Sequence, residues 1–250
     1  MSAPSAPVAA APATAGAAPL HPTAPPTFHH RALPAHMPPL QSEAGRAHFR
    51  AALAQGNAEA FFPLSAHFHT QADPGWCALG TLVTALNALD IDPGRVWKGP
   101  WRYYGEELLD CCKPLDEAKR EGLSLAELAC LAHCNGAEGM PVYAAEASLE
   151  ALRADLRAAV RAPEGEVLIV NYSRKAMQQT GEGHYSPLGA YDEDSDMVLI
   201  LDVARFKYPP HWAPLAQLFD ALRAPDPLTG ASRGWLRLRP AAQAAPHCGG

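Results

Sequence analysis

The order of helical and extended patterns along the chain constrains its fold more than any other feature. In the first half, apolar residues recur at steps of three and four, which is typical of amphipathic helices. Helices are predicted at 44–53, 77–89, from Ser124 onward and at about 148–161. Short apolar segments bounded by Gly, Pro or acidic residues then predict strands at 166–172, 184–191, 197–203 and 234–239. Helices followed by strands predict an α+β domain and not a doubly wound one.

Composition divides the chain near residue 40. Residues 1–40 contain twelve Ala and ten Pro, and Arg31 is their only charged side chain. Because Pro interrupts helices and so little apolar surface is available, residues 1–42 are predicted to be a disordered tail. The predicted domain is 43–240, followed by a flexible C-terminus at 241–250. A targeting peptide is the alternative for the tail, but such peptides are Arg-rich and amphipathic, and this segment is neither.

Charge and cysteine content exclude several classes of protein. The net charge is −6 and no Lys/Arg cluster is present, so nucleic acid is not an expected partner. The apolar stretches end well before the roughly 18 residues that a transmembrane helix needs, so no membrane partner is expected. Six cysteines are too few for a disulfide scaffold. We therefore expect a soluble, cytoplasmic protein with reduced thiols.

Cys77 is the candidate nucleophile. It follows the turn-forming residues 73–76 and opens a predicted helix. The positive end of a helix dipole favours a thiolate, which is the nucleophilic form of cysteine. The alternative is a small buried core residue, because free cysteines are often buried.

Two further residues complete a catalytic pattern with Cys77. His184 begins one predicted strand and Asp202 ends the next, and the acidic turn 192–196 separates them. If these strands pair antiparallel, His184 and Asp202 lie opposite each other across the ladder, where a carboxylate can orient an imidazole. Gln71 lies six residues before the cysteine and could donate a hydrogen bond to an oxyanion.

Several stretches of the sequence closely resemble the catalytic domain of phytochelatin synthases. They are LDIDPGRVWKGPWR at 89–102, LDCC at 109–112, CLAHC at 130–134, QTGEGH at 179–184 and LILDVARFKYPPHW at 199–212. The resemblance covers about residues 60–240, implies a papain-like fold, and places the catalytic triad on Cys77, His184 and Asp202. Trp76 and Ala78 stand where the family usually has Tyr and Gly. We expect no Cys-rich C-terminal domain like that of the eukaryotic members.

The resemblance also implies an activity. It is γ-glutamylcysteinyl transfer between glutathione molecules, with glutathione and phytochelatin oligomers as partners and no tightly bound cofactor. Cd²⁺ or Zn²⁺ would act as activator and as the glutathione thiolate complex, in heavy-metal detoxification. The resemblance assigns the second substrate to Arg95, Arg174, Lys207 and Tyr208, while Arg205 would brace Asp202 or bind a donor carboxylate. A homodimer is left open.

Four cysteines, Cys111, Cys112, Cys130 and Cys134, suggest a metal site because soft metals prefer thiolates. Their spacing is poor for a closed zinc site, and a core thiol is the alternative for Cys130. Two other functions remain open: a thiol peptidase that hydrolyses the acyl-enzyme after releasing glycine, and a non-enzymatic metal-binding stress protein.

Overall fold

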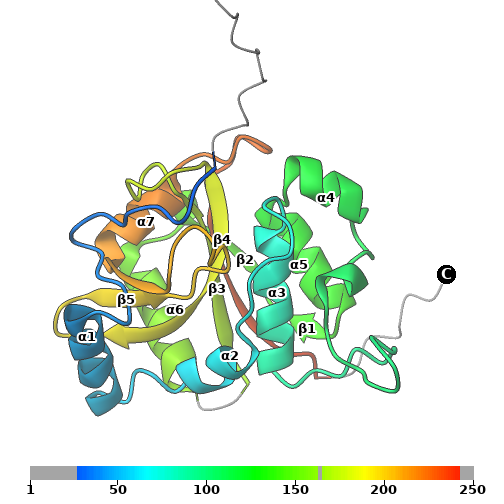
Figure 1. Ribbon diagram of the computed structural model, residues 1–250, viewed down its shortest axis with the longest axis horizontal. Helices are drawn as coiled ribbons and strands as arrows, with labels where there is room; N and C mark the ends of the chain where they lie inside the picture. Colours follow the sequence, from blue (N-terminus) through cyan, green and yellow to red (C-terminus); the bar gives the residue numbers. More distant parts are fainter. Residues whose placement is uncertain (1–26, 163–164, 243–250) are drawn as a thin grey trace, which may run out of the picture.

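An antiparallel sheet forms the centre of the protein. Figure 1 shows the computed structural model, which describes residues 27–162 and 165–242. The sheet order is β1-β7-β3-β4-β5-β6, with β2 also paired to β7, and every pairing is antiparallel. The strands are β1 Ala137–Glu138, β2 Pro141–Tyr143, β3 Val167–Ser173, β4 Gly183–Asp192, β5 Met197–Ile200, β6 His211–Pro214 and β7 Gly234–Pro240. The α+β prediction is confirmed.

Helices from the first half of the chain cover one face of this sheet. They are α1 Glu43–Ala54, α2 Phe61–His67, α3 Cys77–Ala88, α4 Leu115–Glu121 and α5 Leu125–Cys134, with a 3-10 turn at Glu106–Leu108. Every residue of α3 from Ala78 to Asn87 is buried, so this helix lies in the middle of the packing, beside β4 (Figure 1). The predicted packing of the nucleophile helix on the sheet is confirmed.

Two helices cover the opposite face. These are α6 Leu149–Arg161 and α7 Leu215–Arg223. Side chains alternate along β3: Ile169 packs into the core beneath α3, whereas Val170 and Tyr172 pack into the core beneath α6 and α7. Because both faces are covered, almost every residue of β3 and β4 is buried. Polar side chains on these strands therefore need partners within the protein.

The predicted elements are largely present, with differences that have local causes. The capping box at Ser124 and Glu127 is formed and starts α5, as predicted. The sequence patterns missed α2, α4, α7, β1, β2 and β6, which are short or lack a strong period. The strand predicted at 197–203 ends at Ile200, so Asp202 lies in the following loop.

The predicted boundary of the disordered tail is wrong. Met37 is fully buried, and Pro39 forms an isolated β-bridge with His211. The Leu40 N–H donates to the Pro210 carbonyl at 2.8 Å, and the Trp212 N–H donates to the Pro38 carbonyl at 3.0 Å. Residues 37–40 thus run beside β6 and form hydrogen bonds with backbone groups along its outer edge. The rest of the predicted tail up to residue 26, and residues 243–250, lie outside the described residues.

Candidate active site

Cys77 is the first residue of α3 and remains partly accessible. A turn places it there: the Asp73 carboxylate accepts from the Gly75 N–H at 2.9 Å, and the Asp73 carbonyl accepts from the Trp76 N–H at 2.9 Å. The backbone N–H groups of Tyr185 and Ala78 donate toward its sulfur. Burial nevertheless raises the pKa of Cys77, against the effect of these N–H groups and of the Arg174 charge. Burial therefore opposes the stabilisation of the thiolate that the helix position predicts.

His184 and Asp202 lie together, as the sequence predicted. His184 Nε2 is 2.8 Å from Asp202 Oδ1, and both side chains are buried. The ring of Tyr172 packs edge-on against the imidazole, with 5.7 Å between the ring centroids. Burial and the Arg174 charge lower the pKa of His184 to about 4, so the imidazole is neutral. Because Nε2 lies beside the carboxylate, Nδ1 is the nitrogen left for the thiol.

The thiol of Cys77 lies near the imidazole side of the site without a direct hydrogen bond to it. In the part of the chain that the structure describes, no hydrogen bond joins Cys77 to His184. Catalytic hydrogen bonds often shorten only when substrate is bound.

The route by which Asp202 reaches His184 differs from the predicted one. The β4–β5 register shifts between Leu188 and Ala190, and the ladder ends at Ile200. Asp202 therefore approaches from the loop and does not stand opposite the histidine in the ladder. Its Oδ1 accepts the Ala204 N–H at 2.9 Å, which fixes the carboxylate.

Arg174 braces Asp202, which is a role the sequence analysis offered to Arg205. Arg174 Nη2 donates to Asp202 Oδ1 at 2.9 Å, and Nη1 lies 2.9 Å from Oδ2. The arginine is only 2% exposed, so it cannot bind the second substrate as expected. Burial alone would raise the pKa of Asp202, but the neighbouring His184 and the charge and hydrogen bond of Arg174 hold it well below its usual range. The carboxylate is therefore ionised at any physiological pH.

Two cations remain near the triad without a carboxylate partner in the described residues. Arg205 is exposed, with its guanidinium 5.1 Å from the Phe68 ring. Lys207 is half-buried, and both burial and the Arg174 charge lower its pKa. Tyr208 is buried beneath Arg174 at 5.1 Å, and its hydroxyl accepts the Thr180 N–H at 2.8 Å. Of the expected substrate residues, Arg205 and Lys207 are thus free to bind an anion, whereas Tyr208 supports Arg174.

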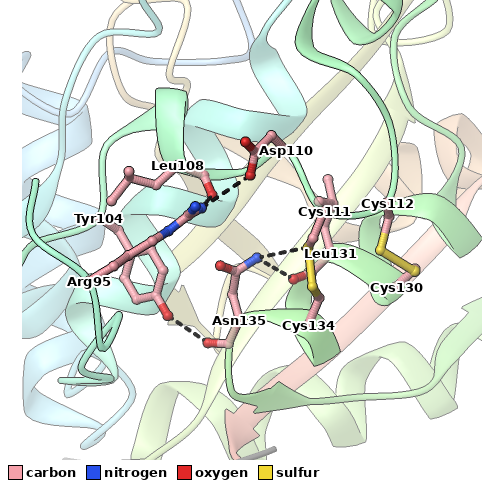
Figure 2. The surroundings of a disulfide bond; sticks show 10 residues. All are labelled: Arg95, Tyr104, Leu108, Asp110, Cys111, Cys112, Cys130, Leu131, Cys134 and Asn135. Atoms are coloured by element: carbon pink, nitrogen blue, oxygen red, sulfur yellow. Dashed lines mark hydrogen bonds and ion pairs between the residues drawn. A yellow bond between two sulfur atoms is a disulfide. The ribbon is translucent and has the colours of Figure 1, made fainter. Parts of the chain in front are cut away.

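Arg95 lies elsewhere. Figure 2 shows it beside Asp110 and donating to the Leu108 carbonyl, in the surroundings of a disulfide. Arg95 Nη2 lies 3.2 Å from Asp110 Oδ1. No contact with the triad residues is present among the described residues. The expected role of Arg95 in binding the second substrate is not supported.

Gln71 is close to α3, but its amide is already in use. Its Nε2 donates to the carbonyls of Asp73 at 2.8 Å and Pro74 at 3.1 Å. Its Oε1 is buried without a hydrogen-bond partner. In this state Gln71 holds the turn before Cys77. To act as the predicted oxyanion donor, Gln71 would have to give up one of these two hydrogen bonds.

The four remaining cysteines of the described residues form two disulfides, Cys111–Cys134 and Cys112–Cys130 (Figure 2). The adjacent pair does not bond to itself, as expected, but the expectation of reduced thiols is wrong. Cys130 is exposed, so the core alternative is also wrong. Disulfide sulfurs are not thiolate ligands, so the cysteines do not fit a metal site in this oxidation state. The sulfurs of Cys111, Cys112 and Cys134 lie within 4.8 Å of one another, so reduction would bring three soft ligands together.

Glu106 is a buried acid that the sequence analysis missed. Its two oxygens accept the Ala72 N–H, at 3.2 and 3.0 Å, and it is 4% exposed. Burial raises its pKa to about 7. A Cβ added at Gly80 would lie 2.8 Å from Glu106 Oε1, so the absence of a side chain in α3 makes room for it. No local pattern could reveal this contact, because it joins residues 34 apart.

A second buried polar group, also missed, lies beside the first residues of β4. Arg233 donates to Asn171 Oδ1 at 2.9 Å and lies 3.7 Å from Asp226 Oδ2. A Cβ at Gly183, next to His184, would be 2.4 Å from Arg233 Nη1. Arg233 is 4% exposed and Asp226 6%, so this pair supports the start of β4 and is closed to a ligand.

The fold and the site together define a class. A cysteine at the start of a central helix, packed on an antiparallel sheet that carries a histidine and is followed by an aspartate, is the papain-like arrangement. The family model for phytochelatin synthase matches residues 28–235. The chain belongs to the phytochelatin synthase family.

Individual relatives agree with this family. Glutathione gamma-glutamylcysteinyltransferase 3 of Lotus japonicus is 46% identical over 84% of this chain and 44% of its own length. Glutathione gamma-glutamylcysteinyltransferase 1 of Arabidopsis thaliana is 44% identical over 84% of this chain and 43% of its own. The Schizosaccharomyces pombe enzyme of that name is 38% identical over 86% and 51%. The chain thus spans about half the length of these relatives or less.

A solved structure was also found. The double glycine motif protease from an AMS/PCAT transporter, in complex with the leader peptide, is 14% identical to this chain, with a TM-score of 0.41. The match covers 70% of this chain and 91% of the protease chain.

Among residues 27–162 and 165–242, no helix has the length and apolar character that crossing a bilayer would require.

Proposed function

We propose that this chain transfers γ-glutamylcysteine from one glutathione to another, releasing glycine and forming phytochelatins. The observation that carries the proposal is the 2.8 Å distance between His184 Nε2 and Asp202 Oδ1. Tyr185, the residue after His184, donates its backbone N–H toward the Cys77 sulfur and so brings the histidine and the cysteine to the same site. Such a constellation supplies a nucleophile, a base and the acid that orients the base.

The reaction follows from the protonation states of the site. Cys77 transfers its proton to His184 Nδ1 as the sulfur attacks the carbonyl between cysteine and glycine of glutathione. Asp202 stabilises the imidazolium that forms, because its carboxylate is ionised beside Nε2. The imidazolium then protonates the departing glycine amine, which leaves a thioester on Cys77. The α-amine of the second glutathione attacks that thioester, and the cysteine is regenerated.

Substrate carboxylates need cations, and two are free. Arg205 and Lys207 lie three and five residues after Asp202, in the same loop, with no carboxylate partner in the described part of the chain. Charge-assisted contacts to carboxylates are strong and directional. We assign substrate binding to these two residues and remove Arg174 and Arg95 from that role.

Metal enters this scheme as part of the substrate. Cd²⁺ or Zn²⁺ bound by glutathione thiolates would reach the site as the complex, and activation would follow from supplying it. The scheme requires no tightly bound cofactor, because cysteine, histidine and aspartate supply the proton transfers.

The experiment is incubation with glutathione and Cd²⁺ and identification of the products by mass. Oligomers of γ-Glu-Cys with a terminal glycine are expected. γ-Glu-Cys alone would make the chain a hydrolase, and no turnover of glutathione would contradict both activities and favour a metal-binding role.

The assignment of Lys207 can be tested separately. Lys207→Ala should leave release of the first glycine intact and raise γ-Glu-Cys at the expense of oligomers, because water replaces a poorly held acceptor. Lys175→Ala, an exposed lysine in the β3–β4 connection, is the matched control and should not change the ratio. An unchanged ratio in Lys207→Ala would remove it from acceptor binding.

A further inference from the structure

Behind Asp202, a line of buried side chains continues away from the thiol as far as β6. Arg174 Nη1 donates to Gln179 Oε1 at 2.7 Å. Gln179 Nε2 lies 2.9 Å from His211 Nε2, and His211 Nδ1 lies 2.9 Å from the Pro209 carbonyl. Gln179 is 6% exposed and His211 is fully buried. These residues are too deeply buried for water to replace one of their partners.

The hydrogen bonds of this line have one consistent assignment. The Arg174 guanidinium only donates, so the Gln179 oxygen must face it. The Gln179 amide nitrogen then points to His211, whose Nε2 must accept. The His211 proton is therefore on Nδ1, where it is donated to the Pro209 carbonyl. A protonated His211 would present a second donor to the Gln179 amide and break this order.

Burial keeps His211 in that neutral state. Burial lowers its pKa, as does the Arg174 charge, against the opposite effects of the Asp202 charge and the Pro209 carbonyl. No other charged group within the described residues is in contact with its ring, and Tyr208 is a neutral neighbour with 6.4 Å between the ring centroids. A neutral imidazole therefore accepts from Gln179 throughout the physiological range of pH.

We propose that His211 is a positioning residue for the catalytic triad. By accepting from Gln179 it fixes the amide that holds Arg174, and Arg174 in turn fixes Asp202 against His184. The effect of His211 on glutathione turnover rests on the proposed function, whereas its effect on the reactivity of the Cys77 thiol does not. Across the described part of the chain, the His211 side chain makes no hydrogen bond to Cys77 or to the substrate-binding cations, so it acts only through this line.

The competing account is that His211 only fills space. It lies in β6, and its backbone pairs with Pro39 at the edge of the sheet. The neighbouring Trp212 is equally buried, and its indole nitrogen has no hydrogen-bond partner among the described residues. Trp212→Phe therefore disturbs the packing of the same strand without touching the line, and it is the matched control.

The test compares His211→Leu, His211→Gln and Trp212→Phe by the pH dependence of Cys77 alkylation with iodoacetamide. Loss of one buried hydrogen bond that orients the base should slow alkylation near pH 7 by about five- to tenfold in His211→Leu. The rates should converge well above the ordinary thiol pKa of about 8.5, where the thiolate forms without a base. His211→Gln, whose oxygen can take the place of Nε2, should recover most of the loss, and Trp212→Phe should follow the wild-type profile.

Turnover adds an independent readout. For glycine release from glutathione, kcat should fall in His211→Leu while KM stays unchanged, because no substrate contact is lost. If His211→Leu does not fold, Gln179→Met removes the same link and should shift the alkylation profile in the same way.

The outcomes separate the two claims. A wild-type profile in folded His211→Leu, or in Gln179→Met, would overturn the positioning role. So would equal losses in all three variants at positions 211 and 212, since packing alone would then account for the effect. Shifted alkylation in a protein that does not turn over glutathione would sustain the positioning role and contradict the proposed function.

Discussion

The two sides of the candidate active site are built on different principles. On the sheet side, His184 lies against an aspartate that an arginine holds with two nitrogens, and every group is buried. On the helix side, Cys77 is approached by backbone N–H groups, and the turn before it is held by Gln71 and by the buried Glu106. Fixed charges thus hold the base, whereas neutral hydrogen bonds and one titrating acid hold the nucleophile.

This difference predicts which side of the site stays the same, and which side changes, when pH or redox state varies. A buried ion pair does not change between pH 5 and 8 when its acid has a strongly lowered pKa, as Asp202 has. The helix side carries Glu106, whose pKa is about 7, and the two disulfides a few residues further along the chain. We therefore expect protonation and redox state to act on the cysteine side.

The largest effect should come from Asp202→Asn. The amide cannot stabilise an imidazolium as a carboxylate does, so the rate of acylation should fall by about 10⁴-fold. Single-turnover release of glycine measures it, and Asp194→Asn, an exposed acid in the β4–β5 turn, is the control. Activity close to wild type would mean that the sheet side does not depend on its fixed charge.

Arg174→Leu should show, in the free energy of unfolding, that the sheet side depends on its paired charges. It leaves Asp202 buried without its cation, which typically costs about 3–5 kcal/mol in the free energy of unfolding. Denaturant unfolding measures this cost. Arg205→Leu is the control, because this arginine is exposed in the loop after Asp202, and its free energy of unfolding should stay within about 0.5 kcal/mol of wild type. Equal values for the two variants would contradict the bracing of Asp202.

The disulfides should matter only when they are oxidised. Replacing Cys112 and Cys130 together by Ser opens a link between residues 18 apart, which should lower the free energy of unfolding by about 3 kcal/mol. With a reductant present, the variant and the wild type should unfold alike. A difference that persists under reduction would show that these positions stabilise the protein by packing.

Glu106 gives the smallest effect, and its sign is set by its pKa. The folded value of about 7 lies above the usual value of 4.5, so the native state binds more protons between these pH values. The free energy of unfolding should therefore fall as pH rises from about 4.5 to 7 and then level off, with a total change of up to about 3 kcal/mol.

Glu106→Gln should remove this slope, because the amide does not titrate. Glu107→Gln, at the exposed neighbouring acid, should retain it. Unfolding measured at several pH values gives both curves. Parallel curves for wild type and Glu106→Gln would place the titration in another group.

The sequence predicted the parts of this site that local patterns encode. The turn before Cys77 and the Ser124 capping box are written in consecutive residues, and both are observed. The spacing of His184 and Asp202 pointed to the right pair, although through a register that the structure does not have. Two residues at the ends of paired strands far from their turn come close even when the ladder ends before them.

The parts that it missed are all long-range. Arg205 is the brace expected from the sequence and Arg174 an expected substrate residue, and only the position of Asp202 beyond β5 selects Arg174 as the brace. The pairing of Cys111 and Cys112 with α5 depends on how that helix packs. Met37 lies in a Pro-rich segment whose apolar residues do not recur at a helical or strand period. Its burial comes from packing against the sheet, which no local pattern predicts.

The central claim is that Cys77, activated by His184 and Asp202, accepts an acyl group from glutathione. Intact-mass and peptide-mass measurements of the protein mixed with glutathione test it most directly. The account predicts one γ-glutamylcysteinyl group per chain, bound to Cys77 as a thioester, with one glycine released, and no such group in Cys77→Ser. Glycine release without an adduct on Cys77, or an adduct on another cysteine, would contradict it.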